Sequence, residues 1–156
     1  MNGDGGDIYV TSAAARKIRD VLSEIGRKGY STASPFSVGK LEKRMIEYAN
    51  NNGITLGGKS LYMGPKSISH ATRSVKIRNG IAVSGTTLAK FPSNRSKMDL
   101  YYEGKVFVYT DYKSKFIIHP DYVIKTKNGK ARKVNFITAS KVNDPNEFKL
   151  PKYKKV

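Results

Sequence analysis

The sequence predicts an α+β protein in which N-terminal helices pack on one face of a twisted antiparallel β-sheet. Two observations lead to this fold class. The first part of the chain has apolar residues at helical spacing. The part after Pro92 has short runs rich in Val, Ile, Phe and Tyr, separated by turns that contain glycine. Helices followed by a meander of strands are typical of α+β folds, with the helices covering one face of the sheet.

The first helix is predicted to run from Thr11 or Ser12, as N-cap, through about Ile25. Its apolar residues recur at i, i+3, i+4 and i+7 and form one stripe, and Gly26 follows as a stop signal. The stripe consists of Ile18, Val21, Leu22 and Ile25. Residues 1–10, rich in Gly, Asp and Asn, are expected to be a flexible lead-in.

A second helix is predicted from about Ser37 to Asn50, after a loop from Gly26 to Pro35. We expect this helix to bury four apolar side chains. They are Leu41, Met45, Ile46 and Ala49. Residues 54–63 are interrupted by glycines, and they predict either a short strand or a loop.

Residues 65–92 are compatible with two structures. Pro65 is a favourable first residue for a helix that would end near Arg78. Alternatively, Asn79-Gly80 is typical of a type I′ turn, and apolar residues alternate on either side of it, as in a hairpin. The alternating residues are Val75, Ile77, Ile81 and Val83. We favour a helix through at least Val75.

The remainder of the chain has the pattern of an antiparallel meander. Glu103-Gly104 and Asn128-Gly129 are turn pairs, and the runs between them are rich in aromatic and β-branched residues. Strands are expected at residues 97–102, 105–110, 115–119, 122–127 and 134–139. Residues 11–142 are therefore predicted to form a single domain, with residues 143–156 as a basic C-terminal arm.

The composition excludes several classes of protein. With 38% hydrophobic and 10% aromatic residues, this chain of 156 residues is too apolar for a disordered basic tail. No apolar run approaches the roughly 20 residues of a membrane span, and the N-terminus has no apolar signal core. The absence of cysteine excludes a disulfide framework, a thiol nucleophile and a thiolate zinc site. We expect a monomer with no membrane span.

The net charge indicates a polyanionic partner. The chain has 29 Lys and Arg against 12 Asp and Glu, a formal charge of +17. Nucleic acid is favoured over a membrane surface, because the basic residues are spread through Tyr-rich segments and do not form a cationic amphipathic helix. Two segments contain no acid, one between Glu47 and Asp99 and one from Tyr122 to Asn143. The candidate nucleic-acid contacts are Lys66, Lys76, Arg78, Arg95, Lys113, Lys125 and Arg132.

The first of the two histidines, His70, has the surroundings of a catalytic acid/base group. If residues 65–75 are helical, Lys66, His70 and Arg73 fall at i, i+4 and i+7 and share one face. An imidazole can move a proton near neutral pH, and the two cations can stabilise a pentavalent phosphorane. RNA supplies its own nucleophile, the 2′-hydroxyl. This pattern therefore predicts metal-independent cleavage of RNA.

The second histidine, His119, follows an apolar strand in the motif FIIHP. A histidine at a strand end is often structural, but it could be a second acid/base group if that end faces the helix. Thr110, at the end of the predicted strand 105–110, and Tyr112, just after it, can donate hydrogen bonds to phosphate, and tyrosine can also stack on bases. The catalytic candidates are therefore His70, Arg73, His119, Thr110 and Tyr112.

The order of these segments resembles a known family. Helices precede the basic segment SHATRSVKIRNGI, which is followed by KVFVYTDYKSKFIIHPDYVIKT. The pattern, over roughly residues 65–140, is similar to the C-terminal ribonuclease toxin domains of bacterial contact-dependent inhibition and polymorphic toxin systems. These domains belong to the barnase/EndoU/colicin/RelE superfamily.

The resemblance implies a fold, a target and a partner. The family packs N-terminal helices on a twisted antiparallel sheet, needs no metal or cofactor, often cleaves tRNA and is neutralised by an acidic immunity protein. Such domains are delivered as part of a larger toxin and act in the cytoplasm of the target bacterium. By position, His70 would be the acid/base group and Arg73 or Arg78 the phosphate ligand, with Thr110 and Tyr112 as polar groups on the central sheet.

Two other functions remain open from the sequence. Asp99, followed by Asp111-Tyr-Lys113 on the next strand, is similar to the PD-(D/E)xK nuclease signature, in which carboxylates bind Mg²⁺. Glu42 or Glu47 would supply a further carboxylate from a helix. The non-enzymatic alternative is a nucleic-acid-binding module that uses the basic segments and the tyrosines. Cleavage in EDTA separates these alternatives from the ribonuclease.

Overall fold

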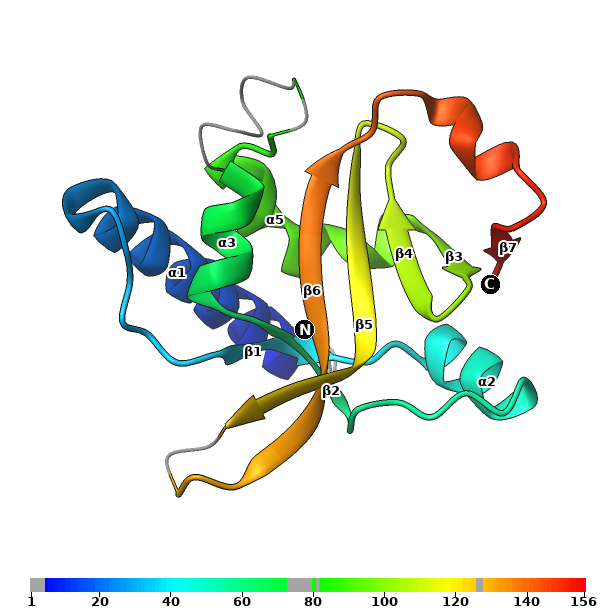
Figure 1. Cartoon of the computed structure of the whole chain (residues 1–156), viewed down its shortest axis with the longest axis horizontal. Coiled ribbons are helices and arrows are strands. Elements are labelled where there is room, and N and C mark those ends of the chain that lie inside the picture. Colours follow the sequence, from blue (N-terminus) through cyan, green and yellow to red (C-terminus); the bar gives the residue numbers. More distant parts are fainter. Residues whose placement is uncertain (1–4, 73–79, 81, 126–127) are drawn as a thin grey trace.

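A mostly antiparallel sheet of seven strands organises the molecule (Figure 1). The computed structural model describes residues 5–72, 80, 82–125 and 128–156. The strands are β1 (Phe36–Lys40), β2 (Ser60–Met63), β3 (Asp99–Glu103), β4 (Val106–Thr110), β5 (Ser114–Lys125), β6 (Ala131–Lys141) and β7 (Lys154–Lys155), in the order β1-β2-β6-β5-β4-β3-β7. The helices are α1 (Gly5–Lys28), α2 (Lys43–Asn51), α3 (Pro65–Thr72) and α5 (Gly85–Asn94), with the short 3-10 helices η1 (Arg95–Lys97) and η2 (Pro145–Lys149). The predicted α+β class with N-terminal helices is confirmed.

Helix α1 is longer than the sequence pattern indicated at both ends. It begins at Gly5, so residues 5–10, which were predicted to precede the helix, are part of it. Extending an existing helix is easier than starting a new one, because each added residue gains a backbone hydrogen bond. At the other end, the helix passes through Gly26 and stops at Gly29, which has a φ of 80° and donates to the Ile25 carbonyl at 2.7 Å.

The predicted second helix is correct only in its second half. Strand β1 occupies the first part, and α2 begins at Lys43. Phe36 pairs with Met63 of β2, so a tertiary contact with a strand later in the chain decides the conformation of this segment. Met45 and Ala49 are buried as expected, whereas Ile46 is exposed.

The ambiguous segment begins with a helix. Helix α3 spans Pro65–Thr72, while residues 73–79 and 81, which include Arg73, Lys76 and Arg78, lie outside the described residues. A second helix, α5, was not expected. Ser84 caps it by accepting a hydrogen bond from the Thr87 amide at 3.1 Å.

The predicted meander is confirmed for β3, β4, β5 and β6, which pair successively and antiparallel. The two strands predicted at 115–119 and 122–127 form one strand, β5, with a bulge between His119 and Tyr122. Gly57 packs against this bulge: a side chain there would come within 2.5 Å of the Pro120 carbonyl and the Val134 backbone. β2 joins the other side of β6 in parallel, through Leu61 and Tyr62.

The C-terminal segment belongs to the folded domain, contrary to the predicted arm. Phe148 is 5% exposed, and β7 pairs with β3 at the edge of the sheet. Lys115 donates to both oxygens of Glu147 at 3.2 Å, and the Tyr153 hydroxyl donates to the same carboxylate at 2.8 Å. The segment is basic in sequence, but the buried side chain of Phe148 and the pairing of β7 hold it against the sheet.

Two hydrophobic clusters define the faces of the sheet. On the helix face, residues such as Phe107, Tyr109, Phe116 and Ile118 form one cluster with buried residues of α1, α2, α3 and α5. On the second face, Tyr101, Val108 and Ile117 pack beneath Phe148 and Tyr153. Because neighbouring strand residues point to opposite faces, His119 and Thr138 also lie on the second face.

Candidate functional site

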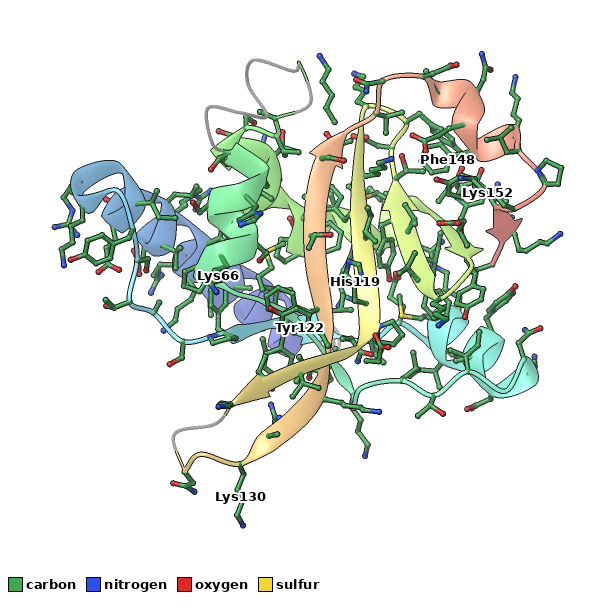
Figure 2. All side chains as sticks on the ribbon, viewed as in Figure 1. Lys66, His119, Tyr122, Lys130, Phe148 and Lys152 are labelled. Atoms are coloured by element: carbon green, nitrogen blue, oxygen red, sulfur yellow. The ribbon has the colours of Figure 1, made fainter. Side chains whose placement is uncertain are left out.

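The second face has two parts, which we call the covered half and the open half. The covered half is formed by β3 and β4 and lies under residues 142–156. The open half is formed by β5, β6 and the end of β2. It carries Tyr62, His119, Tyr122, Arg132, Phe136 and Thr138. In Figure 2 this half faces the viewer between α3 and the C-terminal segment, with His119 and Tyr122 on it.

Three strands align one row of side chains across the open half. Tyr62 of β2 pairs with Phe136 of β6, and Phe136 pairs in turn with His119 of β5. Residues paired in this way have their side chains on the same face, about 5 Å apart. The row therefore places the imidazole of His119 beside the ring of Phe136, with the ring of Tyr62 one strand further along.

His119 is the titratable group at the centre of this half. Its Nε2 lies 3.2 Å from Thr138 Oγ1, on the neighbouring strand. Partial burial of the imidazole lowers the pKa of His119 below its ordinary 6.5, and the carboxylate of Asp121 opposes that shift. The imidazole is consequently neutral at pH 7. In that state it can accept a proton while Thr138 holds the ring.

Tyr122 and Phe136 form an aromatic stack next to His119. Their ring centroids are 4.2 Å apart and their planes differ by 15°. Phe136 is buried, whereas Tyr122 is 41% exposed. The bulge before Tyr122 lets it pair with Val134 and return to the same face as His119.

Arginine and lysine border the aromatic row. The guanidinium of Arg132 donates to the Tyr62 hydroxyl at 2.6 Å and lies 5.3 Å from the centre of the same ring. Lys66 is exposed in the first turn of α3, which follows β2 directly and packs beside β6. In Figure 2 Lys66 lies on α3, beside β6. These groups can bind an anion and stabilise negative charge on it.

His70 lies in a different environment from His119. It is exposed, in the last turn of α3, one turn after Lys66. Arg73, the third member of the predicted helical face, and the predicted contacts Lys76 and Arg78 lie outside the described residues. His119, by contrast, lies on the sheet and contacts Thr138 of the neighbouring strand.

Thr110 and Tyr112 belong to the covered half, and their polar groups serve the fold. Thr110 is fully buried. Its hydroxyl donates to the Ser114 carbonyl at 2.9 Å and accepts from the Tyr112 amide at 2.8 Å. The Tyr112 hydroxyl donates to Asp99 and lies 2.7 Å from the Tyr101 hydroxyl. These bonds hold Tyr112 at a φ of 69°, a conformation that residues other than glycine rarely adopt.

The remaining predicted contacts are dispersed. Arg95 lies in η1 and packs against Gly39, and its buried Nη1 has no hydrogen-bond partner within the described part of the chain. Lys113 is exposed in the turn between β4 and β5. Lys125 is exposed at the end of β5, beside the β6 residues that lead to Arg132. Its partner is Ala131, so its side chain alternates to the face opposite Arg132, which pairs with Ile124. Among the described residues, the predicted contacts that border the open half are therefore Lys66 and Arg132.

The carboxylates of the metal-nuclease alternative do not come together. Asp99 lies on the covered half, where it binds Tyr112 and forms an ion pair with Lys155 at 3.6 Å. Asp111 accepts from the amides of Lys113 and Ser114 in the turn. Glu42 accepts from Tyr109, on the helix face. Among the described residues there is no group of three acidic or histidine side chains that could hold a metal ion.

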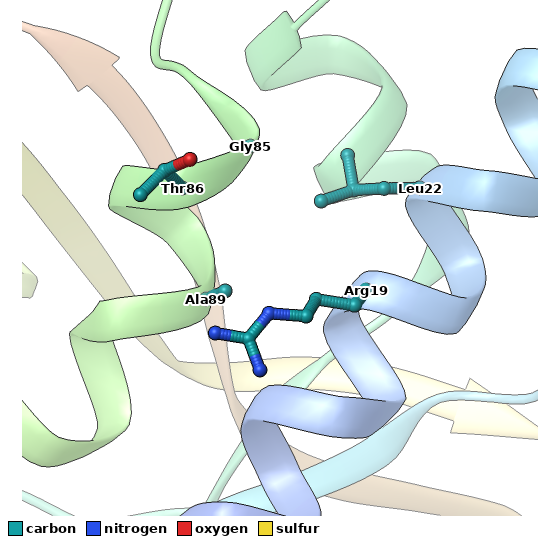
Figure 3. Close-up of a pocket in the computed structure, with 5 residues that line it drawn as sticks. All are labelled: Arg19, Leu22, Gly85, Thr86 and Ala89. Carbon is teal, nitrogen blue, oxygen red and sulfur yellow. The ribbon is translucent and has the colours of Figure 1, made fainter.

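A shallow pocket of about 270 Å³ lies elsewhere, between α1 and α5 (Figure 3). It is lined by Arg19, Leu22, Gly85, Thr86 and Ala89. A side chain at position 85 would come within 3.0 Å of Leu22, so the glycine permits the close approach of the two helices. The pocket is a gap in this helix packing, on the opposite side of the sheet from His119.

The aromatic and hydroxyl residues of the open half were not predicted as site residues. Tyr62, Tyr122, Phe136 and Thr138 have the alternating pattern of ordinary strand residues. Their spacing shows that they share a face, but not that the face is open.

The described part of the chain contains no helix long and apolar enough to cross a membrane. Comparisons with protein-family models, curated proteins and solved structures found no match.

Proposed function

We propose that this domain is a metal-independent endoribonuclease whose acid/base group is His119 on the open half of the sheet. The observation that carries the proposal is the position of His119. Its ring contacts Thr138 and is neutral at pH 7, and it lies in an open row of aromatic side chains bordered by cations. The proposal moves the predicted centre of catalysis from His70 to His119.

The reaction that fits these groups is transesterification by the RNA 2′-hydroxyl. Neutral His119 takes the proton of that hydroxyl, and the oxygen attacks the adjacent phosphorus. The O2′–P bond forms as the P–O5′ bond breaks, and the leaving 5′-oxygen takes a proton from solvent. The products are a 2′,3′-cyclic phosphate and a 5′-hydroxyl. Arg132 and Lys66 are the cations proposed to stabilise the charge on the phosphorane.

The charge of +17 supports an RNA substrate and an acidic protein partner. Together with the family resemblance, we propose that the domain is the toxic part of a delivered bacterial toxin. In this proposal tRNA is the target, and an acidic immunity protein binds the open half. The domain would then act in the cytoplasm of the target bacterium.

The test compares two histidine variants on RNA in the presence of EDTA. His119→Ala is expected to lower the cleavage rate by about 100-fold or more, the usual size of a general acid/base contribution. His70→Ala is the matched control, and it is expected to cleave at close to the wild-type rate. Thermal unfolding of both variants checks that each remains folded.

Each other outcome identifies a different function. An active His119→Ala protein together with an inactive His70→Ala protein would move the site to α3. Cleavage that disappears on chelation would support a metal-dependent nuclease. RNA binding without any cleavage would leave a nucleic-acid-binding module. End-group analysis that finds no cyclic phosphate would overturn the proposed reaction.

A further inference from the structure

Tyr122 is an exposed aromatic side chain with a rigid support. Its ring lies nearly parallel to that of Phe136, with the centroids 4.2 Å apart. Phe136 is 4% exposed, so the supporting ring is fixed in the sheet, whereas Tyr122 is 41% exposed. One side of the tyrosine ring is thus packed on protein, and a large part of its remaining surface faces solvent.

The backbone around Tyr122 is also fixed. The bulge between His119 and Tyr122 is packed by Gly57, whose amide donates to Asn135 Oδ1 at 2.7 Å. Asn135 is fully buried and donates in turn to the Ser60 carbonyl at 3.0 Å. These contacts hold the tyrosine in place, so a ligand that packs on the ring would not have to order it first.

Tyr122 differs in this respect from the other exposed large apolar residues of the described chain. These are Tyr30, Ile46, Val123 and Leu150. Of this group, Tyr122 is the residue with a ring stack, and it lies on the same face as His119. A flat, supported ring beside a cationic border is the arrangement that binds nucleobases, because every base has a π-face.

We propose that Tyr122 is a base-stacking residue, which makes the open half a site for unpaired nucleotides. A base next to the bound phosphate stacks on the exposed face of the tyrosine, while Arg132 contacts the backbone. A base within a duplex is already stacked on both sides and cannot reach the ring. The inference rests on the proposed function for the reaction, but the stacking itself does not require cleavage.

The experiment measures binding without cleavage. The probe is a short single-stranded 2′-deoxy oligonucleotide containing 2-aminopurine, whose fluorescence falls when the base stacks. It has no 2′-hydroxyl and is not a substrate of the proposed reaction. Wild-type protein is expected to quench it. Tyr122→Ala is expected to weaken its Kd about tenfold or more and to abolish the quenching.

Two variants and one second probe control the measurement. Tyr122→Phe keeps the ring and is expected to bind within about twofold of wild type. Tyr30→Ala removes a tyrosine that is 59% exposed and is expected to change nothing. The same oligonucleotide annealed to its complement should bind wild type and Tyr122→Ala with equal affinity.

The results separate this inference from the proposed function. Equal binding and quenching by wild type and Tyr122→Ala would overturn the stacking role, even if the protein cleaves RNA in EDTA. An equal loss of duplex binding in Tyr122→Ala would also overturn it. Weaker single-strand binding in Tyr122→Ala would support the stacking role, even if no RNA is cleaved.

Discussion

The covered and open halves of the second face contain similar kinds of residues in opposite situations. In the covered half, carboxylates and hydroxyls bind one another: Asp99 accepts from Tyr112, and Glu147 accepts from Lys115 and Tyr153. In the open half, His119 contacts one hydroxyl, and Tyr122 has one packed side. One half uses its polar and aromatic groups to close the fold, and the other presents them to solvent.

Residue type alone therefore does not identify a functional site on a sheet. Tyr112 and His119 both looked catalytic in the sequence, and they lie near the two ends of one stretch of chain. The C-terminal segment covers the first of them and not the second. The following predictions test that contrast.

The largest effect is expected when the anchor of the covered half is removed. Phe148 packs among three tyrosine rings, with centroid distances from 4.9 to 5.6 Å. Phe148→Ala is therefore expected to lower the free energy of unfolding by about 3 kcal/mol. Urea denaturation followed by circular dichroism measures the change. At temperatures where the variant stays folded, its nucleic-acid binding should equal that of wild type.

A matched control comes from the same segment. Leu150 is 47% exposed, and Leu150→Ala should leave the free energy of unfolding within about 0.5 kcal/mol of wild type. An unchanged stability in Phe148→Ala would show that the segment does not close the covered half. The contrast between the two halves would then fail.

A smaller effect is expected for the hydroxyl of Tyr112. Tyr112→Phe removes the bonds to Asp99 and Tyr101 but keeps the ring that packs edge-on against Phe148. The free energy of unfolding should fall by about 1 kcal/mol. The rate of RNA cleavage should stay within about twofold of wild type. A hundredfold loss of cleavage in a folded variant would return Tyr112 to the active site.

The smallest effect concerns the pH dependence of the open half. A general base must be neutral, so kcat/KM is expected to rise with pH through the pKa of His119, with a midpoint below 6.5. The Asp121 carboxylate raises that pKa against the effect of burial. Asp121→Asn should therefore move the midpoint to lower pH. A shift in the opposite direction would contradict the assignment of His119 as the base.

The lowered pKa of His119 also affects the stability of the fold. Folding lowers the pKa of His119, so the unfolded chain binds its proton more readily. The contribution of His119 is fully present above the ordinary value of 6.5. It decreases as the pH falls through the lower pKa of the folded state. His119→Ala should remove this part of the pH dependence of unfolding.

Local patterns were sufficient for much of the fold. The stripe of α1 and the turn pair Glu103-Gly104 predicted elements that the structure contains. The failures occurred where distant segments meet. Phe36 is in a strand because it pairs with Met63 of β2, and Phe148 is buried because its ring packs on that of Tyr101. Neither partner, Met63 or Tyr101, can be recognised from the residues that are near Phe36 or Phe148 in the sequence.

The α+β class, the strongly basic character and the presence of two histidines could all be read from the sequence alone. Each follows from the amino-acid composition or from the spacing of apolar residues along a short segment, and neither depends on contacts between distant segments. Which histidine lies on an open sheet face beside a supported aromatic ring depends on the packing of distant segments. That difference depends on where residues 142–156 pack, because a segment that covers one half of a sheet face leaves the other half exposed.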